Sequence, residues 1–495
     1  MKAINKLAGQ TAIYGLPSII GRLLNYLLVP LHTSVFLKES FGVITEMYAY
    51  VAFLVVFLTY GMETAYFRFQ SKEEKQDSSV FSTVLYSLIG STLLFWAISS
   101  SFSQSIADWL GYPENNEYVL WFALIVGLDA ISSIPLAKLR IETKAIRFAG
   151  INLASIAVNI GLNLFWLGYC MPAFESGQSN FLINWLYSPE IGVGYVFLAN
   201  LFASLIKFLL LTPQFRQLKL EFDWKMWRAM IVYGSPLLLS SLAIIVNENA
   251  DKILIKRLLI DELGTEGATG MVGIYGACYK LSIIISLFIQ AFRYAAEPFF
   301  FAQAQDQSAP KTYAKIMNYF VITCALIFMG VMFYIDILKY FLANEEYWEG
   351  LHIVPILLMA NIFLGIFYNL SVWYKLNGMT RYGAMIAGVG AVITIVLNFW
   401  WIPIFGYLGS AWATLICYFS MSLLSYFIGK KYYKVPYQLT KVLFYLLSAL
   451  GLHLLFAHFI SDLSTSFDYT LKAIVMVLFV AMAWALEKPK KALIS

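Results

Sequence analysis

Two cations lie deep inside apolar segments of the chain. Arg22 falls in the apolar run 8–32 and Lys280 in the run 270–296, each about ten residues, or about 15 Å along a helix, from one end of its run. Unpaired charge is costly in hydrocarbon, so both side chains should face a wet interior. Arginine offers a planar fork for oxyanions and lysine a mobile point charge. The pair therefore predicts anion binding; the alternative is a structural ion pair or snorkelling to the interface.

Polar residues recur around both cations at steps of three and four, which places them on one face of each helix. The two stripes are Thr11, Tyr14, Ser18, Arg22 and Asn25, with Pro17 between them, and Tyr279, Ser282, Ser286, Gln290, Arg293 and Glu297. Lipid would not accept such faces, so we expect a central cavity. Its expected contact residues are Arg22, Asn25, Tyr279, Lys280, Gln290 and Arg293. Interhelical hydrogen bonding in a closed bundle is the alternative.

Carboxylates within or beside the apolar runs are candidates for coupling or gating, because a buried carboxylate can exchange protons. These candidates, with one adjacent cation, are Glu46, Glu63, Asp129, Glu248, Asp251 and Lys252. Ordinary ion pairing is the competing interpretation for each carboxylate. Glu248 and Lys252 have the i,i+4 spacing of a helical ion pair, and Arg293 and Glu297 have it in reverse order. Lys256 and Arg257 should lie in water at the rim, where screening makes them nearly dispensable.

The elements that carry these residues are long apolar runs. The chain has 495 residues, of which 60% are hydrophobic and 13% charged, against about 25% charged in soluble proteins. This excludes a water-soluble enzyme, and a net charge of +5 is too small for a nucleic-acid binder. We expect an all-α polytopic membrane protein with about fourteen transmembrane helices. The runs are 8–32, 42–67, 80–102, 118–138, 148–170, 190–212, 229–255, 270–296, 313–335, 351–374, 383–402, 407–429, 441–460 and 470–487.

Short connections and missing motifs argue against an enzyme. The longest connection, 171–189, cannot hold a catalytic domain, and the chain has neither a phosphate-binding G-x-x-x-x-G-K-[ST] loop nor an H-E-x-x-H zinc pair. The cysteines lack paired spacing, and the histidines are scattered, as packing or interfacial residues would be. These residues are Cys170, Cys278, Cys324 and Cys417, and His32, His352, His453 and His458. We expect no cofactor or metal, and any transport must use substrate flux or a gradient of H⁺ or Na⁺.

The distribution of lysine and arginine predicts the orientation. With the N-terminus in the cytoplasm, most of the 34 Lys and Arg residues fall in inner segments, so both termini should be cytoplasmic. The outer cations would be Lys38, Lys252, Lys256, Arg257, Lys339 and Lys472. The N-terminus has two lysines but no cleavage site after a short apolar core, so we expect a retained first helix rather than a signal peptide.

An internal repeat divides the chain. Tyr14-Gly15-Leu16-Pro17 matches Tyr233-Gly234-Ser235-Pro236, and Phe41-Gly42-Val43-Ile44 matches Val272-Gly273-Ile274-Tyr275; a third pair joins the fifth and eleventh runs. Six runs separate equivalents, so the two lobes should share one orientation, without inversion. The expected parts are an N-lobe at 1–228, a C-lobe at 229–440 and two further helices with a cytoplasmic tail at 441–495.

These motifs also resemble a known family. Phe41-Gly42-Val43 through Tyr60-Gly61-Met62-Glu63, the Asp251-Lys252 pair, and Val272-Gly273-Ile274-Tyr275 followed by Tyr279-Lys280-Leu281 resemble Wzx-type polysaccharide flippases. These belong to the MOP exporter superfamily, with the lipid II flippases and MATE antiporters. The resemblance implies two six-helix lobes around a cavity, alternating access, and an undecaprenyl-pyrophosphate-linked oligosaccharide as cargo at a bacterial inner membrane. Its implied partners are that lipid-linked substrate, membrane lipids, and a polysaccharide polymerase and ligase.

The resemblance carries over to individual residues. Arg22 takes the place of a cavity arginine in lipid II flippases, and Lys280 that of the basic residue after the helix 8 tyrosine. The second run has Glu46, Tyr50 and Phe57 but not the cation of the lipid II branch, and Lys252 replaces an arginine of the family motif. The last two helices would border a groove for the isoprenoid tail.

Three alternatives stay open at this point. The first is a MATE-like antiporter of small molecules, whose cavity should present unpaired carboxylates instead of cations. The second is a lipid II flippase. The third is a membrane polymerase or ligase, which would need a large outer loop.

Overall fold

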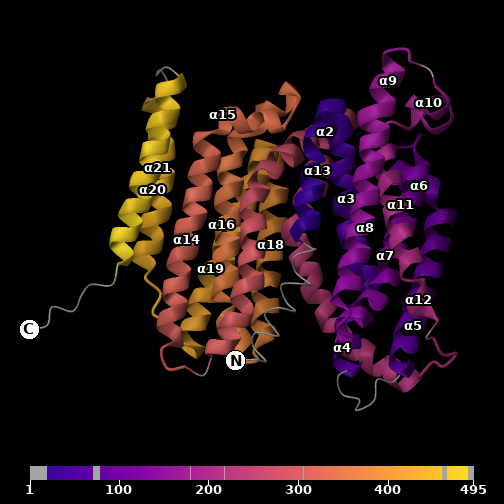
Figure 1. Ribbon diagram of the computed structural model, residues 1–495, viewed down its shortest axis with the longest axis horizontal. Coiled ribbons are helices and arrows are strands. Elements are labelled where there is room, and N and C mark those ends of the chain that lie inside the picture. Colours follow the sequence, from indigo (N-terminus) through magenta and orange to yellow (C-terminus); the bar gives the residue numbers. More distant parts are fainter. Residues whose placement is uncertain are drawn as a thin grey trace, which may run out of the picture.

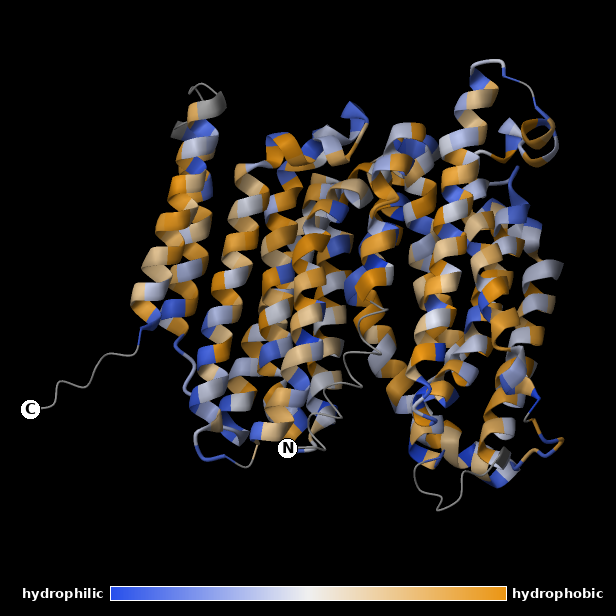
Figure 2. Ribbon diagram, viewed as in Figure 1, coloured by the Kyte–Doolittle hydropathy of each residue, from blue (hydrophilic) through white to orange (hydrophobic). Residues whose placement is uncertain are grey.

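The computed structural model describes residues 19–70, 78–178, 180–216, 218–304, 306–459 and 465–488, and every regular element in these ranges is a helix. Eleven helices of the described residues are long and apolar enough to cross a membrane, and two shorter apolar helices span Ile19–Val35 and Gly194–Leu210. Figure 2 shows apolar residues along the middle of the helices and hydrophilic residues gathered at the ends and connections. This pattern is that of a multi-pass helical bundle.

The N-terminal helices form one group, on the right of Figure 1. Their bounds are Ile19–Val35, which includes α2 (Val29–Val35), then α3 (Lys38–Thr59), α4 (Met62–Gln70), α5 (Ser78–Ser101), α6 (Ser103–Leu110), α7 (Asn116–Ile141), α8 (Ala145–Asn163), the π-helical η1 (Leu164–Cys170), α9 (Met171–Glu175), α10 (Phe181–Leu186), η2 (Pro189–Ile191), α11 (Gly194–Leu210) and α12 (Thr212–Phe215). Aromatic contacts join its members: Tyr48 of α3 packs edge-on against Phe122 of α7 and Phe197 of α11.

The C-terminal helices form the second group, with α20 and α21 outermost beside α14 (Figure 1). Their bounds are α14 (Ala309–Phe333), α15 (Ile335–Leu338), η3 (Lys339–Phe341), η4 (Glu345–Ile353), α16 (Val354–Leu370), α17 (Val372–Leu376), α18 (Thr380–Phe405), α19 (Tyr407–Tyr432), α20 (Leu439–Phe459) and α21 (Thr465–Glu487). Glu487 fixes the outer pair: it accepts hydrogen bonds from Asn318 of α14 at 3.2 Å and Tyr445 of α20 at 2.9 Å, and pairs with Lys441 at 2.9 Å.

Between the groups lies α13 (Trp224–Gln303), an 80-residue helical segment that folds back on itself. Gly264 has φ 70° and ψ 174°, a conformation that glycine adopts readily. Tyr275 donates a hydrogen bond to Asp251 Oδ2 at 2.6 Å, whereas these residues would lie about 36 Å apart along a straight helix. We call residues 224–263 the first arm of α13 and residues 265–303 its second arm. Each arm contains one expected run, 229–255 or 270–296.

The expected runs coincide with helices, with local differences. Run 42–67 is not one helix, because Tyr60 (φ 31°) and Gly61 (φ 76°) adopt left-handed conformations that end α3 and precede α4. Run 148–170 is α8 continued by η1, and the connection 171–189 contains α9 and α10. The first part of run 8–32 lies outside the described residues. Fourteen membrane crossings and the three domain boundaries remain predictions.

The matched motifs of the repeat meet in space. A Cβ atom on Gly273 would lie 1.8 Å from the Lys38 carbonyl oxygen and 3.0 Å from the Gly42 nitrogen, and one on Gly42 would lie 2.0 Å from the Thr269 carbonyl oxygen. The backbones of α3 and the second arm are therefore in direct contact. Only glycine fits at both positions.

Candidate functional site

A cavity of about 590 Å³ lies between the two groups of helices. Its walls come from helix Ile19–Val35, α3, α8 and α11 on one side and from both arms of α13 with α16 on the other. All six expected contact residues line it: Arg22, Asn25, Tyr279, Lys280, Gln290 and Arg293. Thr11, Tyr14, Pro17 and Ser18 lie outside the described residues. The α3 lining, from Phe41 to Ala49, starts at the contact of α3 with the second arm.

The cavity cations are poorly neutralised. Arg22 faces the side-chain amide of Gln290, whose oxygen, turned towards the guanidinium, accepts from Nη1 at 2.8 Å. Lys280 forms neither a hydrogen bond nor an ion pair with the side chains that the structure describes. Its charged neighbour Lys252 is also a cation. Among the described lining residues four cations face one carboxylate, Glu248, so positive charge remains available to an anion.

Arg293 occupies the end of the cavity away from the glycine contact. Its guanidinium lies over the Tyr368 ring, 3.9 Å from the centroid, and its Nε is 3.7 Å from Glu297. Glu297 is closer to Lys375, at 2.5 Å. The expected Arg293–Glu297 pair is thus present, but Lys375 neutralises most of that carboxylate.

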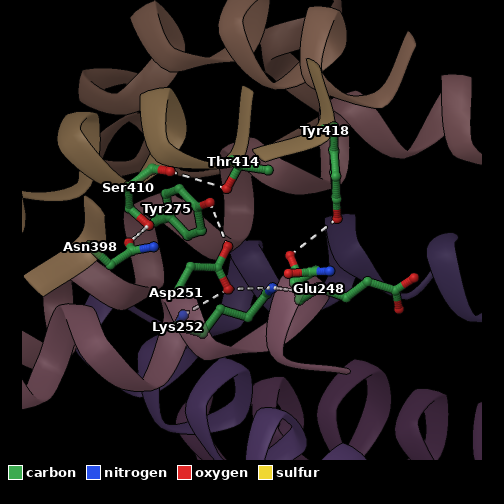
Figure 3. Close-up of polar contacts among 9 residues, drawn as sticks. Glu248, Asp251, Lys252, Tyr275, Asn398, Ser410, Thr414 and Tyr418 are labelled. Carbon is green, nitrogen blue, oxygen red and sulfur yellow. Dashed lines mark hydrogen bonds and ion pairs between the residues drawn. The ribbon is translucent and has the colours of Figure 1, made fainter. Parts of the chain in front are cut away.

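Figure 3 shows a cluster of polar residues from both arms of α13, α18 and α19. Asp251, 2% exposed, accepts from the Tyr275 hydroxyl at 2.6 Å and pairs with Lys252 Nζ at 3.1 Å. Lys252 also donates to the backbone carbonyl of Glu248 at 2.6 Å. The expected Glu248–Lys252 side-chain ion pair is therefore wrong, because the ammonium reaches the neighbouring Asp251 and a carbonyl instead. In Figure 3 the Glu248 carboxylate points away from the cluster, and this residue lines the cavity.

Three other candidate carboxylates lie outside the cavity and are paired. Glu46 bonds Lys256, Glu63 bonds Arg140, and Asp129 bonds Lys207 at 2.7 Å with Ser204 at 2.9 Å. The pairing interpretation is confirmed for these three. Among the described cavity residues, Glu248 is the remaining acidic group.

The expectation that Lys256 lies in water is wrong, and Arg257 is half-buried. Lys256 is fully buried: its Nζ lies 2.7 Å from Glu46 Oε2, donates to the Leu110 carbonyl at 2.8 Å, and sits 3.7 Å from the ring centroid of Tyr112. Arg257 donates to the Trp109 carbonyl at 2.7 Å and lies over the Trp109 ring. The reason is that α6 and the turn after it cover this end of the first arm.

Sequence reasoning missed a set of neutral polar residues in the cavity wall. They are His32, Tyr48, Asn159, Asn163, Asn200, Asn249, Asn361 and Tyr368. His32, for which a packing or interfacial role is expected, is buried, and its Nε2 lies 2.8 Å from Asn163 Oδ1. A signal did exist: Asn159 and Asn163 are four residues apart in an apolar run, a spacing that puts both on one helical face.

The arrangement is suited to holding an anion rather than to metal chemistry. Arg22, Lys252, Lys280 and Arg293 line the cavity, and Glu248 is the one acidic group among its described lining residues. Among the described residues no group of three or more His, Cys, Asp or Glu side chains could hold a metal ion, and the four cysteines are buried and free.

Comparison with known proteins extends these observations. The family described as "Polysaccharide biosynthesis protein" matches residues 35–344. A search of curated proteins finds no match. The fold is similar to that of the lipid II flippase MurJ in an inward closed conformation, with a TM-score of 0.71, 14% identity, and 95% of this chain and 98% of that chain covered.

Two MATE transporters are also similar in fold. An inward-facing multidrug resistance transporter of the MOP superfamily gives a TM-score of 0.60 at 13% identity, covering 87% of this chain and 94% of that chain. A Vibrio cholerae MATE transporter in the bent form gives 0.57 at 12% identity, with 90% and 100% covered. At these identities the likeness concerns the fold.

Proposed function

The chain belongs to the polysaccharide biosynthesis protein family, a family of flippase-type membrane transporters, and from this we propose that it flips an undecaprenyl-pyrophosphate-linked oligosaccharide. It is a multi-pass membrane transporter with the MurJ- and MATE-like fold of the MOP superfamily, and not an enzyme. In our proposal the pyrophosphate binds Arg22 and Lys280, and the two lobes rock around the cavity in alternating access. The cargo then crosses the bacterial inner membrane for surface polysaccharide export.

The observation that carries this proposal is the pair of insufficiently neutralised cations. Among the described residues Arg22 forms no ion pair and bonds the neutral amide of Gln290, and Lys280 has no acidic partner, although the cavity also holds the carboxylate of Glu248. A pyrophosphate in hydrocarbon would be unsolvated, whereas in this cavity two cations from opposite walls can offset its charge. The bidentate geometry of arginine adds orientation to that attraction.

A lipid II flippase is the second candidate, supported by the fold similarity to MurJ. The α3 wall argues for a polysaccharide precursor instead, because its lining residues Phe41, Ile44, Thr45, Tyr48 and Ala49 include no cation. A MATE-like antiporter of organic cations is less well supported, since four cations in the cavity would repel such a substrate.

Further parts of the proposal concern energy coupling and the membrane. Glu248 is our candidate for exchange of H⁺ or Na⁺, because it lines the cavity and is not engaged by Lys252. The termini face the cytoplasm by the distribution of positive charge. We further propose that α20 and α21 border the path of the isoprenoid tail and that a polymerase and a ligase act on the flipped product.

The test is translocation of a defined lipid-linked sugar by the purified full-length protein in proteoliposomes. Arg22→Ala and Lys280→Ala should each slow flipping by about ten- to hundredfold, since a charged hydrogen bond contributes about 1.5–3 kcal/mol. Lys434→Ala, which removes an exposed cation outside the cavity, is the matched control. Parental rates for both cavity variants would overturn the proposal.

A further inference from the structure

We propose that the N-terminal wall of the cavity is a binding subsite for a neutral sugar, built from the carboxamides of Asn25, Asn159, Asn163 and Asn200. This inference rests on the proposed function and adds the position and chemical class of the first sugar of the cargo. The subsite differs from the cations in chemistry, because all four groups are uncharged, and in position from Lys252, Lys280 and Arg293, because these three lie on α13 whereas the carboxamides come from the N-terminal helices.

Three of the amides, those of Asn25, Asn159 and Asn163, form a connected ladder across two helices. Asn159 Nδ2 of α8 donates to Asn25 Oδ1 at 3.2 Å, and Asn163 Nδ2 donates to the Asn159 carbonyl at 2.8 Å. His32 closes the ladder, with its Nε2 2.8 Å from Asn163 Oδ1. These bonds fix the orientation of each amide, so the wall is organised before a ligand arrives.

The carboxamide wall retains hydrogen-bond donors and acceptors that the described residues do not use. A carboxamide has two donor hydrogens and an acceptor oxygen. Asn25 uses its oxygen to accept from Asn159, so its amide hydrogens remain unused by the described residues. Asn200 donates to the Tyr48 hydroxyl at 3.0 Å, so its oxygen remains. Free donors and acceptors in one cavity wall complement sugar hydroxyl and acetamido groups, which both donate and accept.

The charges of the cavity are segregated, and this fixes the orientation of the cargo. Lys252, Lys280, Arg293 and Glu248 all belong to the arms of α13, whereas Arg22 is the one charged residue among the described residues of the N-terminal wall. A cargo with an anionic and a neutral end therefore has one favourable orientation. An acidic sugar would be drawn to the α13 cations instead, so the carboxamide wall favours a neutral one.

The spacing between the two subsites matches a direct linkage. Arg22 and Asn25 lie three residues apart, which is about 4.5 Å along a helix. A pyrophosphate held by Arg22 would thus place the sugar attached to it against Asn25. The aromatic support of Tyr48, which packs edge-on against Phe122 with ring centroids 5.7 Å apart, keeps the Asn200 end rigid.

The experiment compares two probes on the full chain in lipid nanodiscs. The probes are undecaprenyl pyrophosphate and undecaprenyl pyrophosphate carrying one N-acetylglucosamine, and the measurement is the dissociation constant of each. Asn25→Ala and Asn200→Ala should weaken binding of the sugar-bearing probe by about two- to tenfold, the effect of a neutral hydrogen bond, and leave the sugar-free probe unchanged. Arg22→Ala should weaken binding of both probes.

Asn152→Ala is the matched control, because Asn152 is on α8 but bonds the Phe148 carbonyl and does not line the cavity. Parental affinity for the sugar-bearing probe in both asparagine variants, or an equal loss for both probes, would overturn the sugar subsite. If the parental protein binds neither probe, the proposed function fails; if it binds both equally, the function stands and the subsite fails. Thermal unfolding of each variant verifies that it is folded.

Discussion

Lys256 and Glu46 form an ion pair in which both side chains are completely buried. The pair joins the first arm of α13 to α3, and the Tyr112 hydroxyl donates to the same Glu46 oxygen at 2.5 Å. Lys256 also bonds the last carbonyl of α6. Two N-terminal helices, α3 and α6, are therefore tied to the first arm of α13 by this junction.

Removal of one member of this pair should destabilise the fold strongly. Lys256→Met or Glu46→Leu leaves a buried charge without its partner, which costs about 3–5 kcal/mol. We expect a clear fall in Tm in detergent for each single variant and a partial recovery in the double variant, where no charge is left unpaired. Lys434→Met is the control, and single variants with the parental Tm would contradict the buried pair.

The contact between Gly42 and Gly273 should not tolerate a methyl group. Gly42→Ala and Gly273→Ala place Cβ within 2.0 Å of a backbone oxygen, so the helices must separate. We expect loss of monodisperse protein in size-exclusion chromatography. Gly388→Ala in α18 meets nothing within 4 Å and is the control; it should be tolerated, since alanine favours helix over glycine. Normal yield of Gly273→Ala would argue against the close crossing.

Arg22 should need its planar fork as well as its charge. Arg22→Lys keeps the cation but loses bidentate contact with phosphate oxygens. Its flipping rate should therefore lie between those of the parental protein and Arg22→Ala. The assay is translocation of a lipid-linked sugar at fixed ionic strength. Equal rates for Arg22→Lys and Arg22→Ala would mean that flipping depends on the bidentate geometry of the guanidinium and gains nothing from the positive charge alone.

Glu248 should couple transport to an ion gradient. Glu248→Gln removes the titratable group but keeps the side-chain shape, so flipping should persist without acceleration by an imposed H⁺ or Na⁺ gradient. Asp129→Asn, at a paired carboxylate outside the cavity, should retain the parental response. An unchanged gradient response in Glu248→Gln would remove this residue from coupling.

Topology can be tested by labelling single introduced cysteines. Positions Lys144 and Lys434 should react only from the cytoplasmic side, and positions Glu114 and Ser176 only from the outside, because positive residues concentrate in cytoplasmic segments. Labelling of intact cells with an impermeant thiol reagent distinguishes the sides. The four natural cysteines are buried and should give little background.

The sequence by itself determined the apolar runs and the polar face of the second arm of α13. Both signals are local: about twenty apolar residues suffice to indicate a membrane helix, and steps of three and four define a helical face without knowledge of its neighbours. For this reason Tyr279, Gln290 and Arg293 could be assigned to one cavity before the fold was known, and Lys280 could be added from its depth in the apolar run.

Only the tertiary structure decided which groups meet across long separations. Glu46 and Lys256 are 210 residues apart. The burial of Lys256 depends on the position of α6, and no local sequence pattern predicts that position. Lys252 pairs with Asp251 rather than with Glu248. Asp251 also accepts a hydrogen bond from Tyr275, which lies beside it because the chain reverses at Gly264. The ladder from His32 to Asn25 likewise exists only because α8 packs beside the first helix. Charge pairing and polar complementarity depend on distances between helices, and helix packing sets those distances.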